Sequence, residues 1–102
     1  MTEPTPPDPT TGQIAPSGEP AAVLPARWDA LVADLVARGV AGRPLLVSAR
    51  AVTWNDGALG CPEPGVSYLQ ALIDGLQVVV TVDGTTYDYR FGTTDTPRLC
   101  IR

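Results

Sequence analysis

The chain has 102 residues and a formal net charge of −4, and all seven of its basic residues are arginines. This length suffices for one small domain. Because the sequence contains no His and no Lys, it lacks Ser-His and Cys-His pairs, His-bearing zinc sites, Schiff-base lysines and the lysine of Walker-type phosphate loops. We therefore expect a protein that is not an enzyme and that has no catalytic residue, cofactor or metal ion.

The distribution of charge and hydropathy also limits the partners. The arginines are scattered, whereas a nucleic-acid-binding protein needs a basic stripe that displaces counterions from phosphates. The longest apolar runs have the length of a strand, far short of the roughly twenty residues that cross a membrane. Residues 1–25 have neither the basic nor the apolar region of a signal peptide. We expect no nucleic-acid partner and no membrane span, and the lack of a signal peptide favours a cytoplasmic location.

The beginning of the chain differs in composition from the rest. Seven of the eleven prolines lie in residues 1–25, mixed with Thr, Gly, Ser and Glu. Such a segment cannot bury enough apolar surface to offset the entropy lost on folding. We therefore predict a disordered tail over residues 1–24 and a single domain over residues 25–102.

Apolar residues recur at helical spacing between Pro25 and Val40, which predicts an amphipathic helix. Pro25 suits the first turn, and Asp29 favours the positive end of the helix. Arg38 followed by Gly39 is typical of a C-terminal cation and a left-handed cap. The stripe that we expect in the core consists of Trp28, Leu31, Val32, Leu35 and Val36.

A second pattern predicts a tight β-hairpin over residues 76–91. Asp83 and Gly84 are the favoured pair for a two-residue turn, and alternating apolar residues flank them. The opposite face, where Gln77 pairs with Arg90, is expected to meet water. The apolar face gathers the large side chains in the pairs Leu76 with Phe91, Val78 with Tyr89, Val80 with Tyr87 and Val82 with Thr85.

Two further strands are predicted over residues 45–54 and 98–101. Residues 66–73 are expected to form a short helix or turn, which ends at Asp74 and Gly75 before the hairpin. These elements together predict an α+β fold, with one N-terminal amphipathic helix packed on a small, mainly antiparallel sheet of three to four strands.

The two cysteines, Cys61 and Cys100, are candidates for a disulfide. On the chain-entropy model, closing their loop would stabilise this small fold by about 4 kcal/mol. In the last strand, Cys100 points away from the face of Leu99 and Ile101, so pairing requires the central loop to cross the opposite face or wrap the edge. The alternative is two reduced thiols packed as small hydrophobic side chains. Paired cysteines would place the protein outside the cytosol.

Residues 54–65 are rich in Gly and Pro, which prescribes an irregular but stiff path. A pre-ordered exposed loop loses little entropy on binding, so we interpret it as a binding loop for an unknown protein partner. Alternatively, the segment is structural: Asn55 and Asp56 cap turns, Leu59 fills the core and Cys61 anchors the loop. The candidate contact residues are Trp54, Asp56, Leu59, Glu63 and Tyr68.

A resemblance rests on the run from Trp54 to Gln70. It reads Trp-x-Asp-Gly-x-Leu-Gly-Cys-Pro-x-Pro-Gly-x-x-Tyr-x-Gln, and the hairpin that follows contains Tyr87-Asp88-Tyr89-Arg90. This combination resembles a small uncharacterised bacterial domain often found in exported or lipid-anchored proteins. The resemblance covers about half of the chain and implies no particular activity. The chain departs from the exported members because it lacks a signal or lipid-attachment motif.

The leading functional hypothesis is a monomeric, non-enzymatic binding module that presents residues 54–65 to a protein. A protease inhibitor is an alternative, with Leu59 or Glu63 as its specificity residue in the active-site cleft. A purely structural or accessory role is another. Acid-base catalysis by Asp56, Glu63 and Asp74 is less favoured, and so is a calcium site around Asn55, Asp56 and Glu63. Turn carboxylates usually meet water, and three side chains do not fill the coordination of calcium.

Overall fold

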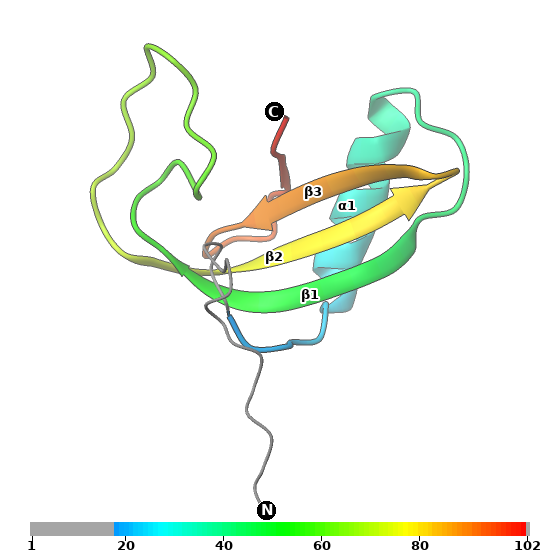
Figure 1. Cartoon of the computed structure of the whole chain (residues 1–102), viewed down its shortest axis with the longest axis horizontal. Helices are drawn as coiled ribbons and strands as arrows, with labels where there is room; N and C mark the ends of the chain where they lie inside the picture. Colours follow the sequence, from blue (N-terminus) through cyan, green and yellow to red (C-terminus); the bar gives the residue numbers. More distant parts are fainter. Residues whose placement is uncertain (1–17, 102) are drawn as a thin grey trace, which may run out of the picture.

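The computed structural model describes residues 18–101. Its elements, in chain order, are α1 (Pro25–Ala37), β1 (Leu45–Trp54), β2 (Ile73–Val82), β3 (Thr85–Phe91) and β4 (Arg98–Leu99). The four strands form one antiparallel sheet in which each strand pairs with the next along the chain, and α1 crosses one face of it (Figure 1). The predicted α+β fold is confirmed. Within the described part of the chain, no helix is long and apolar enough to cross a membrane.

The apolar stripe of α1 packs against the sheet and forms the main core. Leu31 and Leu35 are buried there, and Trp28 packs beside them. The helix ends as predicted, because Gly39 adopts a φ of 83° and the amide of Val40 donates to the Leu35 carbonyl at 3.0 Å. This pattern is a Schellman cap, which satisfies carbonyls that the helix would otherwise leave unpaired.

Two details of the predicted helix are wrong. Val36 is 66% exposed, because it lies at the side of a stripe centred on Leu31 and Leu35. Asp29 lies beyond the first turn, which contains no acidic residue, so it does not occupy the positive end of the helix.

A polar contact also joins α1 to the sheet. The hydroxyl of the buried Tyr89 donates to the Asp34 carboxylate at 2.6 Å, and Nε of Arg38 donates to the same oxygen at 2.6 Å. Burial, followed by the hydrogen bond to Asp34, raises the pKa of Tyr89 well above its usual range. Burial also acts to raise the pKa of Asp34, but the bonds from Tyr89 and Arg38 outweigh it, so the pKa of this carboxyl is lowered.

The hairpin of β2 and β3 has the predicted register. Asp83 and Gly84 both have positive φ values, 50° and 84°, as a type I′ turn requires. The apolar face of this hairpin supplies most of the main core with α1. The confirmed pairs are Leu76 with Phe91, Val78 with Tyr89, Val80 with Tyr87 and Val82 with Thr85.

Strand β1 lies along β2 and contains an irregularity. Its register shifts between Leu46 and Ser48, which is a β-bulge. Beyond the bulge, Ala49 belongs to the main core, whereas Val52 and Trp54 form a second core with different neighbours. Successive side chains of a strand point to opposite faces, so Val52 and Trp54 lie on the face away from α1.

The folded region begins earlier than the predicted boundary at Pro25. The amide of Ala51 in β1 donates to the Glu19 carbonyl at 2.8 Å, and the amide of Ala21 donates to the Ala49 carbonyl at 3.0 Å. Ala21 also packs against the main core. The last part of the predicted tail, residues 18–24, therefore runs along the outer edge of β1. The remainder, residues 1–17, lies outside the described residues.

The predicted helix or turn over residues 66–73 is wrong. This segment is irregular, and β2 already begins at Ile73, so Asp74 and Gly75 lie within a strand. Gly75 is needed for packing rather than for a turn. A Cβ at this position would collide with the Phe91 carbonyl and lie 2.6 Å from Nε1 of Trp54. The last strand is also shorter than predicted, because β4 ends at Leu99.

Candidate functional site

The chain between β1 and β2 forms a long loop with two parts. The inner loop, residues 55–61, returns to the sheet, whereas the outer loop, residues 62–72, extends away from it (Figure 1). The inner loop contacts Trp54 and Arg90, which lie on the sheet face away from α1. The loop therefore crosses that face, which is one of the two paths expected for pairing of the two cysteines.

The inner loop encloses the second core. Val52, Trp54 and Leu59 are buried in it, and Ile73 packs against them. Nε1 of Trp54 donates to the Phe91 carbonyl at 3.0 Å, which fixes the indole across Gly75.

The inner loop also contains a side-chain-capped turn. The amide of Ala58 donates to the Asp56 carboxylate at 2.9 Å, as in an Asx turn. Leu59, next in the chain, adopts a positive φ of 54°. Asp56 thus shapes the backbone, in agreement with the structural interpretation of this part of the loop.

Arg90 of β3 lies between the sheet and the inner loop and holds the loop in place. It is 4% exposed, and its Nη1 donates to the Leu59 carbonyl at 2.9 Å. Its Nη2 and Nε donate to the Asp88 carboxylate at 2.9 and 3.3 Å, and the guanidinium lies 5.2 Å from the ring centroid of Trp54. The expectation that this end of the hairpin face meets water is therefore wrong, because the inner loop covers it.

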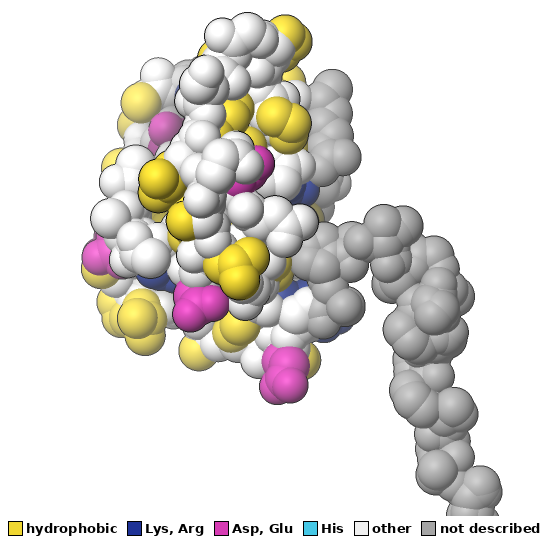
Figure 2. Space-filling view, turned by 90° about the vertical axis from the view of Figure 1, so that its left-hand side faces the viewer, with side chains coloured by type: hydrophobic (Ala, Val, Ile, Leu, Met, Phe, Trp, Pro, Cys, Tyr) yellow, Lys and Arg dark blue, Asp and Glu magenta, His cyan; other side chains and the backbone are white. Residues whose placement is uncertain are grey.

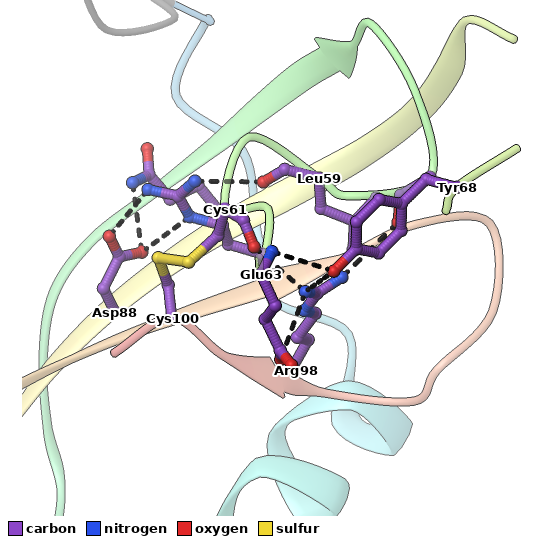
Figure 3. Close-up of a disulfide and its surroundings, with 10 residues drawn as sticks. Leu59, Cys61, Glu63, Tyr68, Asp88, Arg98 and Cys100 are labelled. Atoms are coloured by element: carbon purple, nitrogen blue, oxygen red, sulfur yellow. Dashed lines mark hydrogen bonds and ion pairs between the residues drawn. A yellow bond between two sulfur atoms is a disulfide. The ribbon is translucent and has the colours of Figure 1, made fainter. Parts of the chain in front are cut away.

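Arg98 of β4 holds the two parts of the loop together (Figure 3). Its Nη2 donates to the Cys61 carbonyl at 2.9 Å and to the Tyr68 hydroxyl at 3.2 Å, and the guanidinium lies 5.3 Å from the Tyr68 ring centroid. The Glu63 carboxylate is 3.6 Å from the same Nη2. The amide of Glu63 donates to the Tyr68 hydroxyl at 3.0 Å, which closes a small turn at the base of the outer loop.

A disulfide joins Cys61 to Cys100, with their Cα atoms 5.8 Å apart. Leu99 packs against the main core, whereas the neighbouring Cys100 faces the loop. The opposite orientation predicted for Leu99 and Cys100 is therefore confirmed, whereas Ile101 lies beyond β4 and is 72% exposed. The disulfide, Arg90 and Arg98 therefore all hold the loop near the end of the inner loop.

Apart from Asp56, which caps the turn of the inner loop, the structure separates the candidate contact residues into two groups. Trp54 and Leu59 are buried, so their side chains support the loop and are not available to a partner. In particular, Leu59 cannot enter a protease cleft as a specificity residue. Glu63 is exposed, and Tyr68 is half-buried at the base of the outer loop.

The outer loop carries exposed apolar side chains that the sequence analysis did not single out. Leu69 and Leu72 are 69% and 74% exposed, and Val66 is nearly half exposed. Figure 2, which looks onto the loop end of the molecule, shows apolar side chains dispersed over this surface. In the sequence these residues stand at every third position, within the segment that is predicted to form a short helix or turn.

The described residues offer little for a metal ion. Among residues 18–101, no three His, Cys, Asp or Glu side chains are grouped closely enough to hold one. Of the acids considered for calcium, Asp56 accepts the amide of Ala58, and Glu63 pairs with Arg98.

Together, the fold and the site define a small α+β domain with a disulfide-anchored loop. The model of a domain family of unknown function, DUF8738, matches residues 28–100, and the chain belongs to this family. The matched region includes the whole loop, both arginines and the disulfide. No curated protein and no solved structure matches the chain significantly.

Proposed function

We propose that this domain is a non-enzymatic binding module that presents the outer loop to a protein partner. The observation that carries the proposal is the exposure of Val66, Leu69 and Leu72 on one short segment. Apolar side chains scattered singly are normal on a protein surface, whereas these three lie close together in one short loop that is anchored at its base, which favours a partner-binding role. Glu63 and Tyr68, at the base of this segment, keep their place among the candidate contact residues.

The anchoring of the loop supports the same proposal. Cys61 is held by a disulfide, and Arg98 binds the Cys61 carbonyl and the Tyr68 hydroxyl. A segment fixed at its base loses less conformational entropy when a partner binds, so more of the contact energy remains as affinity. This anchoring limits the positions that the outer loop can adopt.

We also propose that the domain acts outside the cytoplasm of a bacterium, as a monomer. Disulfides persist in oxidising compartments, so the Cys61–Cys100 bond supports this location over the cytoplasm. The resemblance of the run from Trp54 to Gln70 to domains of exported or lipid-anchored bacterial proteins supports the same setting.

Selection from a phage-displayed library of random peptides tests the binding function. The immobilised domain, with its disulfide intact, is the target, and the affinity of each selected peptide is then measured. The loop variant combines Leu69→Ser and Leu72→Ser. The control combines Leu24→Ser and Leu45→Ser, which alter side chains of similar exposure, 61% and 62%, outside the loop.

We expect selected peptides to bind the loop variant about tenfold more weakly than the wild type, a loss of about 1.4 kcal/mol. The control should bind them unchanged. Because all four side chains are exposed, both variants should keep the thermal stability of the wild type within about 0.5 kcal/mol. Peptides that bind the loop variant and the wild type equally would reject the outer loop as a binding surface and favour a structural or accessory role.

A further inference from the structure

The charged residues of the loop and of the start of β2 have one sign. Between residues 55 and 74 the chain contains Asp56, Glu63 and Asp74 and no arginine. Glu63 and Asp74 are exposed, and the side chain of Glu63 is 68% accessible in spite of its contact with Arg98. In the sequence, an acid therefore flanks each side of the apolar segment. Asp74 lies in β2, where its carboxylate accepts a hydrogen bond from the Thr53 hydroxyl at 3.1 Å.

One arginine beneath the loop, Arg98, partly offsets Glu63, because its Nη2 lies 3.6 Å from that carboxylate. The side chains of Arg90 and Arg98 are 5% and 24% exposed, because they point into the protein and bind carbonyls of the inner loop. Figure 2 shows the result on the loop end of the molecule. Carboxylates lie among the apolar side chains, and basic groups are confined to small recessed areas.

We infer that the partner is a protein surface with an apolar pocket bordered by lysine or arginine side chains. This inference rests on the proposed function and specifies the chemistry of the partner. Leu69 and Leu72 would enter the pocket, while Glu63 and Asp74 would meet cations at its border. Complementary charges around an apolar centre steer association and fix orientation, whereas acidic partners are repelled. The negative surface of a membrane is disfavoured for the same reason.

The selected peptides provide the probe for this inference. Their sequences should contain an excess of Lys and Arg over the starting library, next to aliphatic or aromatic residues. Border charges act mainly on the association rate, and salt screens them. The association rate of the tightest basic peptide should therefore fall several-fold between about 0.05 and 0.5 M salt.

A pair of charge variants assigns the effect to the loop. Glu63→Gln with Asp74→Asn removes both exposed acids and keeps the shape of the side chains. Asp83→Asn is the control, because Asp83 is an exposed acid in the hairpin turn and Asn also tolerates its positive φ. At low salt the double variant should associate with the peptide about threefold to tenfold more slowly, while the control keeps the wild-type rate. At high salt the three proteins should converge.

The outcomes distinguish the inference from the proposed function. Neutral or acidic peptides that depend on Leu69 and Leu72 would overturn the basic partner and leave the binding function standing. Basic peptides whose association rate is unaffected by the double variant would also overturn the basic partner and leave the binding function standing. Peptides that do not depend on the outer loop would overturn both.

Discussion

Arg90 and Arg98 are cross-strand partners on β3 and β4, and each binds a different carbonyl of the same loop. Like charges placed opposite each other in a sheet repel, so this pairing is unfavourable by itself. Asp88 neutralises Arg90, and Glu63 lies near Arg98. The two guanidinium groups can therefore lie side by side beneath the loop and hold it at two neighbouring points.

Replacing Arg90 should weaken the whole fold. In Arg90→Met, the Leu59 carbonyl loses its donor and the Asp88 carboxylate loses its cation, which should lower the free energy of unfolding by about 2 kcal/mol. Urea denaturation measures the change. Arg50→Met is the matched control, because Arg50 is exposed and its side chain donates to the Gly18 carbonyl. Equal losses in the two variants would contradict the role assigned to Arg90.

Reduction should destabilise the domain through the unfolded state. Cys61 and Cys100 are 39 residues apart, and a cross-link over this separation stabilises a fold by about 4 kcal/mol on the chain-entropy model. Urea denaturation with and without a reductant measures the difference. A thiol assay in denaturant, without reductant, should detect no free thiol. Two reactive thiols per chain would contradict the disulfide and the proposed extracytoplasmic location.

The contact between Tyr89 and Asp34 should make stability depend on pH. The folded protein lowers the pKa of Asp34 below its ordinary value of 3.8, so the folded state favours the charged form. The contribution is therefore fully present above about pH 4 and is lost as the pH falls through the lower pKa of the folded protein.

Tyr89→Phe tests this contribution, because it removes the hydroxyl and keeps the buried ring. At neutral pH the variant should be less stable than the wild type by about 1 to 2 kcal/mol. At a pH below the lowered pKa of Asp34 the difference should shrink, because the carboxyl is then protonated in both proteins. Urea denaturation at the two pH values provides the comparison, and a difference that does not change with pH would refute the coupling.

Gly75→Ala should disrupt the second core. The new Cβ would collide with the Phe91 carbonyl and press on the Trp54 indole, so strand pairing and the indole hydrogen bond cannot both survive. We expect a loss of about 3 kcal/mol or more, with a shift of tryptophan fluorescence. Gly92→Ala is the control, because its nearest neighbour would be Cγ2 of Ile73 at 3.3 Å. A stable variant with unchanged fluorescence would show that Trp54 does not require this glycine.

The hairpin register could be predicted from sequence because its determinants are local. Asp83 and Gly84 determine the turn, and the alternation of apolar and polar residues along β2 and β3 determines which side chains face the core. The cap at Gly39 is equally local. The burial of Arg90, by contrast, is not determined locally. It depends on the inner loop, which lies about thirty residues earlier in the chain and folds across the sheet. Pairing of Cys61 with Cys100 left two paths open for the loop, across this face or around the edge, and only the first path covers Arg90.

Gly75 shows why a strand was mistaken for a turn. Glycine after aspartate is typical of turns, and the sequence provides no sign that an indole crosses this position. The exposure of Leu69 and Leu72 was equally hidden, because apolar residues at regular spacing usually indicate burial. The place of Gly75 in a strand and the exposure of Leu69 and Leu72 both depend on long-range packing, which local patterns do not encode.

The disulfide also determines how the domain would respond to mechanical tension. Residues 62–99 lie inside the covalent ring that Cys61 and Cys100 close. A pull applied at the two ends of the domain would pass through the sulfur atoms and bypass β2, β3 and the outer loop. These elements could not be drawn out, and the extension would be limited to the chain before Cys61. The surface proposed for binding therefore lies in the part of the protein that a stretching force cannot unravel.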